Sequence, residues 1–165
     1  MLSSEVQKAI NDQINNELYS AYLYLSMSAY CDSLNLNGFA HWMRLQSQEE
    51  VAHAMRLFDF VHDRGGRADL KAIAQPPAQF KSPLDVMEQA LDHERQVTAL
   101  IHKLYELATN QKDYATLAQL QWFLLEQVEE EKVASEIVEQ IKLAGNQGPA
   151  LLLLDSRLGS RTLGG

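Results

Sequence analysis

The stretch GGRADLKAIAQPPAQFK, residues 65–81, separates two pairs of long segments that have helical character. Gly65-Gly66 is a strong helix breaker, and the stretch also contains Pro76-Pro77. A connection of this length can run from one end of a helical bundle to the other, which makes the helices on its two sides parallel. The stretch therefore predicts a bundle of helices with one long crossover in the middle of the chain.

The segments on both sides of the crossover have the periodicity of amphipathic helices. In the first segment, apolar residues recur three and four positions apart, the spacing of one helix face: Ile10, Ile14, Leu18, Ala21 and Leu25. The expected helices cover residues 4–32, 38–64, 82–108 and 113–144, with a short fifth helix at 149–159. Short turns join the first pair and the last pair, so the helices within each pair are antiparallel. We predict an all-α fold, an up-down-down-up four-helix bundle in one domain spanning residues 1–165.

Several helix ends carry capping signals. Ser82 can cap the third helix, and Pro83 suits its first position. Asp113 is the expected cap of the fourth helix, which should end at Gly145.

Composition narrows the class of partner. The formal net charge is −8 at pH 7, which argues against nucleic acid and suits a cationic partner. Cys31 is the single cysteine, so the chain has no internal disulfide and a reducing compartment is expected. The beginning of the chain lacks the pattern of a secretory signal, and the apolar run at 150–154 is too short to cross a bilayer. We expect a cytoplasmic protein without a membrane partner.

Each long helix carries a glutamate inside its own apolar stripe. Residues seven apart lie nearly on one helix face, and apolar residues stand seven positions away on both sides of Glu17, Glu50, Glu94 and Glu130. His53 follows Glu50 by three residues and shares its face. All four acids lie near the middle of their helices. The bundle should therefore bury four carboxylates and one imidazole at one height.

Such a cluster needs compensating positive charge. Burying an unpaired carboxylate costs several kcal/mol, and like charges raise one another's pKa. No lysine or arginine in these stripes lies at the same height. Oxygen ligands with one imidazole suit two divalent ions such as iron or manganese, and also zinc. Glu50 and Glu130 have further ligands close by, so they are the candidates to bridge two ions.

The two halves of the bundle place polar groups in the same register. A shift of 77 residues maps Glu17 onto Glu94, Glu50 onto Gln127 and His53 onto Glu130. The second half thus offers an amide and a carboxylate where the first offers a carboxylate and an imidazole. One metal position should therefore have more protein ligands than the other.

Other polar and aromatic residues leave two interpretations open. Glu49, Glu126 and Glu129 form either a third metal position or a solvated acidic face. Tyr24 is either a core tyrosine with a satisfied hydroxyl or a hydrogen-bonding or redox-active neighbour of the centre. For Trp122, plain packing is at least as good an explanation as a role at the centre.

The remaining candidates are weaker. The other histidines form no ligand pattern and are expected at the surface or its boundary: His41, His62, His93 and His102. The leucine run 151–154 either docks on the bundle or contacts another subunit, and a subunit contact is favoured.

Taken together, these residues resemble bacterial non-haem ferritins over essentially the whole chain. The resemblance rests on Glu-Leu-Tyr at 17–19, Gln-Glu-Glu-x-x-His at 48–53, His-Glu at 93–94, and Leu-Gln-Trp with Glu-Gln-x-Glu-Glu-Glu-Lys at 120–132. It implies a hollow homo-oligomeric cage of 24 subunits. Each subunit would oxidise Fe(II) with dioxygen or peroxide at a di-iron ferroxidase centre, and the cavity would store the ferric oxide mineral.

The resemblance also implies roles for single residues. One iron would be held by Glu17, Glu50 and His53, and the other by Glu50, Glu94 and Glu130, with Glu50 bridging. Gln127 would form a hydrogen bond near the centre, and Tyr24 would lie beside it. A third iron site would be formed by Glu49, Glu126, Glu129 and Glu130.

Related families fit less well. Bacterioferritins have a second Glu-x-x-His whose histidine would fall at Glu130, and they ligate haem through a methionine where this chain has Val51. Haem is therefore not expected. Two rival functions remain from the sequence: a metal-binding bundle without catalysis, and a monomeric di-iron oxygenase acting on an organic substrate.

Overall fold

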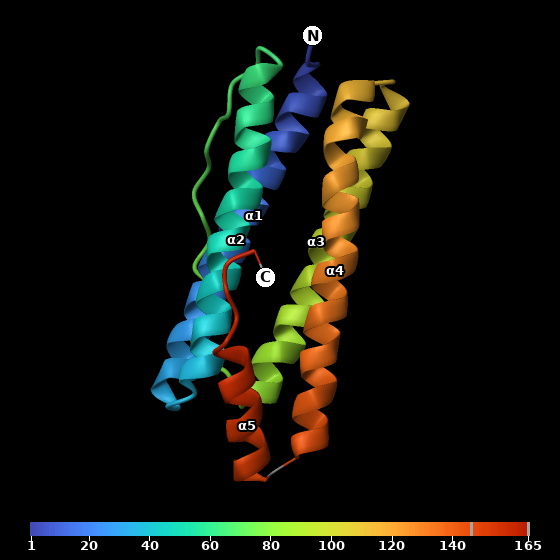
Figure 1. The fold of residues 1–165 in the computed structure, drawn as a ribbon. Coiled ribbons are helices and arrows are strands. Elements are labelled where there is room, and N and C mark those ends of the chain that lie inside the picture. Colours follow the sequence, from blue (N-terminus) through green and yellow to red (C-terminus); the bar gives the residue numbers. More distant parts are fainter. Residues whose placement is uncertain (146, 165) are drawn as a thin grey trace.

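The computed structural model describes residues 1–145 and 147–164. These residues contain five helices and no strand: α1 (Ser4–Ser33), α2 (Asn37–Asp63), α3 (Pro83–Asn110), α4 (Tyr114–Ala144) and α5 (Gly148–Leu158). The four long helices form a bundle, and α5 lies at one end of it (Figure 1). The predicted all-α fold is confirmed, with helix ends that differ from the expected ones by at most two residues. None of the helices in the described chain is long and apolar enough to cross a membrane.

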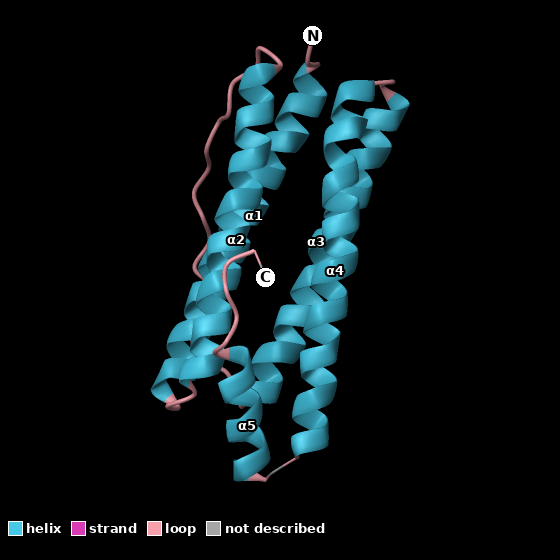
Figure 2. Ribbon diagram, in the orientation of Figure 1, coloured by secondary structure: helices cyan, strands magenta, loops and turns pink. Residues whose placement is uncertain are grey.

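The long crossover sets the direction of the helices. Residues 64–82 run along the outside of the bundle from the end of α2 to the beginning of α3, so these two helices are parallel (Figures 1 and 2). Within each half, α1 packs against α2 and α3 packs against α4. The crossover is tied to α1, because Asn11 Nδ2 donates to the carbonyl of Arg67 over 3.1 Å and Lys71 forms an ion pair with Asp12.

Helices α3 and α4 begin directly after the residues that the sequence predicted as their caps. The Ser82 hydroxyl accepts a hydrogen bond from the amide of Asp85, and the Asp113 carboxylate accepts one from Thr116. Both satisfy donors that the first turn of a helix leaves free. At the other end of α4, Gly145 has φ 58°, a left-handed conformation that glycine adopts without strain. The predicted caps of α3 and α4 are confirmed.

The beginning of α2 is capped from a distance. Leu36 offers no capping side chain, and the Asp155 carboxylate of α5 accepts a hydrogen bond of 2.8 Å from the amide of Phe39. Gly38 makes this approach possible, because a Cβ atom there would lie 1.7 Å from the backbone oxygen of Asp155. The pair fixes α5 against the first turn of α2.

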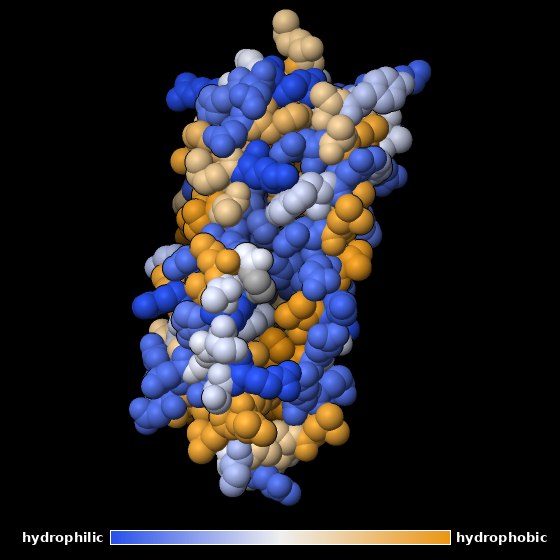
Figure 3. Space-filling view, in the orientation of Figure 1, coloured by the Kyte–Doolittle hydropathy of each residue, from blue (hydrophilic) through white to orange (hydrophobic). Residues whose placement is uncertain are grey.

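The leucine run of α5 has two faces. Leu154 is buried in the core of the bundle, whereas Leu152 and Leu153 are 60% and 70% exposed. Hydrophobic surface is visible at this end of the molecule (Figure 3). Docking on the bundle is therefore confirmed for one face, and a subunit contact stays a prediction for the other.

One residue of the predicted α1 stripe was placed wrongly. Leu25 is 47% exposed, and Tyr24 occupies the buried position instead. A helix has 3.6 residues per turn, so steps of three and four must alternate to stay on one face. The buried face of α1 continues from Ala21 through Tyr24 to Ser28.

The hydrophobic core is divided into two clusters. One contains Ile10, Ile14, Leu57, Ile101 and Phe123, and the other contains Met27, Met43, Met87, Ala134 and Ile137. On every long helix, the glutamate singled out in the sequence lies between the residues of one cluster and those of the other. The apolar halves thus enclose a polar layer at the middle of the bundle.

Candidate metal centre

Each long helix presents one carboxylate to the polar layer. Glu17, Glu50 and Glu94 are 1–2% exposed, and Glu130 is 8% exposed. His53 lies one turn after Glu50 on α2 and is 5% exposed. The structure therefore brings together the five residues that the apolar stripes marked, and it buries all of them.

Their ligand atoms form two overlapping groups. Glu17, Glu50 and His53 make up one group, and Glu50, Glu94 and Glu130 make up the other. Within each group, one oxygen or nitrogen from every residue lies within 4.8 Å of the others. Glu50 belongs to both groups. The fold thus assembles the two sets named by the resemblance, and the ions that they hold stay a prediction.

The centre holds more negative charge than the protein compensates. In the described chain, no lysine or arginine forms an ion pair with any of the four carboxylates, and the nearest basic group is His53. Its Nδ1 lies 3.2 Å from Glu50 and 3.9 Å from Glu17. Oε2 of Glu17 is buried without a hydrogen-bond donor among the described residues. A buried carboxylate oxygen without a partner is energetically costly. The four carboxylates and the imidazole therefore suit a bound cation as ligands.

Burial changes the protonation of the carboxylates. It raises the pKa of Glu130 to about 9 and that of Glu94 to about 7. Burial and the neighbouring charges of Glu94 and Glu17 also raise the pKa of Glu50 well above its usual value. Without metal, the centre therefore holds protons at neutral pH. A cation that binds there must displace them, so its affinity depends on pH.

Two residues from different helices hold Glu94. The Tyr24 hydroxyl donates to Oε1 over 2.5 Å, and Gln127 Nε2 donates to Oε2 over 3.1 Å. Gln127 also lies 3.2 Å from the hydroxyl of Thr98, which in turn lies 2.8 Å from Glu131. The hydroxyl of Tyr24 is thus satisfied, and its partner is a candidate metal ligand. Thr98 was not among the predicted site residues.

Two glutamine side chains that contact the centre were not among the predicted site residues. Gln13 Nε2 donates to Oε1 of Glu17 over 2.9 Å, and Gln46 Nε2 donates to Oε2 of Glu130 over 2.5 Å. Gln13 lies four residues before Glu17, and Gln46 lies four residues before Glu50. Residues four apart on a helix are neighbours on one face, so this spacing places both amides on the inward face, one turn from a glutamate. The sequence spacing could therefore have indicated them.

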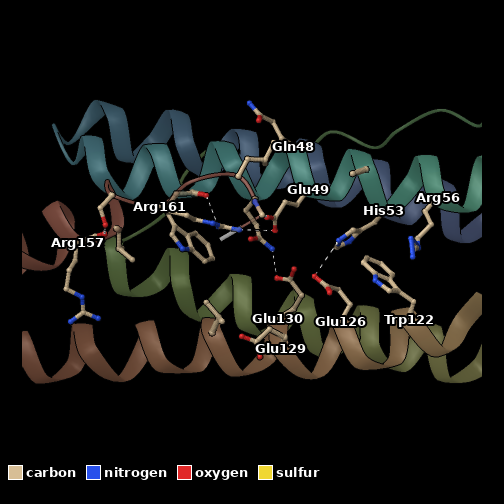
Figure 4. Close-up of a pocket in the computed structure, with 18 residues that line it drawn as sticks. Gln48, Glu49, His53, Arg56, Trp122, Glu126, Glu129, Glu130, Arg157 and Arg161 are labelled. Atoms are coloured by element: carbon tan, nitrogen blue, oxygen red, sulfur yellow. Dashed lines mark hydrogen bonds and ion pairs between the residues drawn. The ribbon is translucent and has the colours of Figure 1, made fainter.

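The outer acids line a pocket between α2 and α4 (Figure 4). The pocket has a volume of about 830 Å³, and its acidic lining consists of Glu49, Glu126, Glu129 and Glu130. The structure groups Glu126 and Glu130 with His53, whose Nε2 lies 3.8 Å from Glu126. Glu129 is exposed. Glu49 instead forms an ion pair of 2.9 Å with Arg161. The third iron site stays a prediction.

Aromatic residues surround the imidazole ligand. The rings of Trp122 and His53 meet edge to face with centroids 5.2 Å apart, and the guanidinium of Arg56 lies 4.2 Å from the centroid of the Trp122 ring. Trp122 therefore packs directly against a candidate ligand.

The remaining histidines lie outside the centre. His93 is half-buried, with Nε2 2.6 Å from the Ser20 hydroxyl, and burial lowers its pKa to about 4. The other three are exposed, as expected: His41, His62 and His102.

Known proteins with similar sequences and folds share this architecture. The family model for a ferritin-like domain matches residues 7–144. A bacterial non-heme ferritin of Bacteroides fragilis is 45% identical over 161 residues, which are 98% of this chain and 100% of that protein. One from Staphylococcus aureus is 38% identical over 162 residues, 98% of each chain.

Solved structures agree with these relatives. An open-pore ferritin from the hyperthermophilic archaeon Archaeoglobus fulgidus has a TM-score of 0.97 and 51% identity, with 98% of this chain and 100% of that chain covered. A closed form of that ferritin, engineered by site-directed mutagenesis, has a TM-score of 0.98 and 51% identity, with 99% of each chain covered. The likeness extends over all five helices.

Proposed function

Because the chain belongs to the ferritin family, we propose that it oxidises Fe(II) at the two groups that share Glu50 and stores the ferric product. The observation that carries the proposal is the buried layer of four carboxylates and one imidazole, for which the described chain supplies no lysine or arginine partner. Iron is the substrate and the cargo. The protein supplies the place and the electrostatics, and iron supplies the redox chemistry.

The two groups give each ion a different set of ligands. One Fe(II) would bind Glu17, Glu50 and His53, and the second would bind Glu50, Glu94 and Glu130. A shell of three carboxylates is harder and more anionic than one that contains an imidazole. Anionic oxygen ligands stabilise Fe(III) more than Fe(II), so they favour loss of an electron from both ions. Tyr24 and Gln127 would keep Glu94 in position rather than bind iron themselves.

The reaction balances with two ions per turnover. Two Fe(II) ions give up two electrons, which together with two protons reduce dioxygen to hydrogen peroxide. When hydrogen peroxide is the oxidant instead, two electrons from two Fe(II) ions and two protons reduce it to two waters. Ion binding also displaces the protons held by the buried carboxylates. Glu94 and Glu130, with pKa values of about 7 and 9, are local sources of such protons.

Storage would require many copies of the chain around a cavity. Apolar side chains stay exposed on four helices of the described chain, among them Tyr22 and Leu25 on α1, Val51 and Met55 on α2, Leu125, Val128 and Leu143 on α4, and Leu152 and Leu153 on α5. Contact with other copies would cover such surface, and part of it is visible in Figure 3. We propose a 24-subunit cage without haem in the cytoplasm. Haem is not expected, because this chain has Val51, which has no thioether, where bacterioferritins have the methionine that ligates haem.

The direct test is stopped-flow absorbance after metal-free protein is mixed in air with two Fe(II) ions per chain. We expect a rapid ultraviolet rise from ferric species that prior zinc abolishes. Glu130→Ala removes a buried ligand and should slow the rise by at least about tenfold. Glu136→Ala changes an exposed glutamate two turns along α4 and should leave it unchanged.

Two results would overturn the proposal. Oxidation no faster than in buffer would leave a metal-binding bundle without catalysis. Fast oxidation by a chain that elutes from gel filtration as an 18.6 kDa monomer would favour the oxygenase alternative.

A further inference from the structure

The chain beyond α5 turns back along α2. Residues 159–164 run beside α2 toward the middle of the bundle (Figure 1). His41 Nε2 lies 2.8 Å from the carbonyl oxygen of Arg161, and Arg161 Nη1 donates to the carbonyl of Trp42 over 3.2 Å. The guanidinium also lies over the Trp42 ring, 4.6 Å from its centroid. These contacts hold the tail in one place on α2.

The tail engages both carboxylate oxygens of Glu49. Arg161 Nη2 donates to Oε2 over 2.9 Å, and the amide of Gly164 donates to Oε1 over 3.4 Å. The side chains of Arg161 and Glu49 are 12% and 20% exposed, so solvent screens their ion pair only in part. Figure 4 shows the pair at one side of the acidic pocket. Glu49 is therefore neutralised by the chain's own cation.

The other pocket arginines are engaged elsewhere. Arg56 lies over Trp122, and Arg157 donates to Gln140 over 3.2 Å. In the described chain, Arg161 is thus the one arginine that forms an ion pair with a carboxylate of the pocket.

A second group of possible ligands spans the pocket, with one member on α2, the helix of Glu49, and two acids on α4, the opposite wall. His53, Glu126 and Glu130 each place a ligand atom within 4.8 Å of the others. Both walls of the pocket therefore offer anionic oxygen, and one of them is blocked by a guanidinium.

We propose that Arg161 is a displaceable counter-ion that sets the affinity of the acidic pocket for a divalent cation. A cation that binds Glu49 together with the opposite acids needs the oxygens that Arg161 and Gly164 now occupy. Binding of the cation must therefore release the tail. Because coupling between two sites is reciprocal, the tail weakens cation binding by the same factor by which the cation weakens attachment of the tail. The inference rests on the proposed function only in taking Fe(II) as the natural cation.

Zinc is a suitable probe because it binds carboxylates and imidazole without redox chemistry. In calorimetric titrations of the metal-free protein, Arg161→Gln should tighten zinc binding at the pocket by roughly five- to tenfold, the lower part of the usual coupling range. Arg161→Lys keeps the charge and should stay close to the original protein. Arg157→Gln removes a pocket arginine that does not contact Glu49 and should have no effect.

Two further measurements locate the effect. Anomalous scattering from crystals equilibrated with graded zinc should show an ion on Glu49 at a lower concentration in Arg161→Gln. Hydrogen exchange of residues 159–164 in the original protein should speed up when zinc saturates the pocket. This exchange assay needs no variant, so it tests the inference even if Arg161→Gln fails to fold.

Either of two results would overturn the inference. One is equal zinc affinity in Arg161→Gln and the original protein, which would make Arg161 an anchor of the tail alone. The other is zinc on Glu49 with the exchange of the tail unchanged. Failure of the proposed function gives a different pattern, because Fe(II) oxidation would be absent while the linkage between zinc and the tail persists.

Discussion

Tyr24 on α1 donates a hydrogen bond of 2.5 Å to Oε1 of Glu94 on α3. Burial, together with the negative charges of Glu94 and Glu50, raises the pKa of Tyr24 far above its usual value, so the hydroxyl keeps its proton and remains a donor. Gln127 on α4 holds Oε2 of the same carboxylate. Glu94 is thus oriented by donors from two other helices. Partners of this kind usually matter almost as much as the ligands themselves.

Tyr24→Phe should therefore impair the centre without unfolding the bundle. The ring stays in the core, and only the bond to Glu94 is lost. We expect the rate of Fe(II) oxidation, or the affinity for the second cation, to fall by about tenfold or more. Stopped-flow absorbance and zinc titration measure the two effects. Tyr30→Phe is the matched control, because the Tyr30 ring packs against Phe80 away from the centre. Equal losses in both variants would contradict the role given to Tyr24.

The metal-free protein should lose stability as the pH rises. Glutamates in the unfolded chain have a pKa of about 4.3, whereas burial raises the folded pKa of Glu94 to about 7 and that of Glu130 to about 9. Between these values the folded state binds more protons than the unfolded state. The free energy of unfolding is therefore highest below the unfolded pKa and falls as the pH rises through the folded values. Thermal unfolding in chelator between pH 5 and pH 9 measures this slope.

Glu130→Gln separates this effect from other titrations. Glutamine keeps the shape of the side chain and an acceptor for Gln46, but it cannot ionise. At pH 8, the metal-free variant should be more stable than the original protein by on the order of a few kcal/mol. At pH 5, close to the unfolded pKa, the difference should shrink to about 1 kcal/mol. A gap that does not change with pH would mean that Glu130 is not held protonated by burial.

Cation binding should release protons. Because buried Glu94 and Glu130 hold protons near neutral pH, zinc must displace them, and its affinity should rise from pH 6 to pH 8. Calorimetry in two buffers with different ionisation enthalpies counts the protons. The count should fall in Glu130→Gln, which has no proton to lose at this position. An unchanged count would place the displaced protons elsewhere.

The sequence was sufficient for much of the fold because its signals are local. The periodicity of apolar residues, the caps at Ser82 and Asp113, and the long proline-containing connection each act within a few turns of chain. The inward glutamates could be found for the same reason, since a carboxylate inside an apolar stripe is visible from spacing alone. Leu25 shows the limit of this reading, because a one-residue error in phase moves a side chain from the core to the surface.

Contacts between distant parts of the chain could not be predicted in this way. The pairing of Arg161 with Glu49 depends on where the tail lies after α5, and no periodic pattern fixes that path. The capping of Phe39 by Asp155 depends likewise on the docking of α5. Gln13 and Gln46 are a different case: their spacing from Glu17 and Glu50 is visible in the sequence, although neither was among the predicted site residues.

Gly38→Ala should destabilise the protein through α5. The new Cβ would lie 1.7 Å from the backbone oxygen of Asp155, so α5 or the first turn of α2 must move. We expect a loss of about 1–3 kcal/mol in the free energy of unfolding. Gly148→Ala is the control, because no neighbouring atom of the described residues lies within 4 Å of a Cβ there. Urea unfolding at one fixed protein concentration compares them, since assembly makes stability depend on concentration. Similar values for the two variants would show that the close approach of Gly38 to Asp155 is not needed.

Asp155→Ala tests the cap itself without a steric clash. The amide of Phe39 lies in the first turn of α2, where Leu36 provides no side-chain acceptor. Losing the carboxylate removes one acceptor and the favourable charge at the positive end of the helix, at a cost of about 0.5–2 kcal/mol. Asp155→Asn keeps an oxygen acceptor and should lose only part of this. In urea unfolding, the order of stability should be the original protein, then Asp155→Asn, then Asp155→Ala. If the two variants are equally stable, the charge rather than the hydrogen bond fixes α5 to α2.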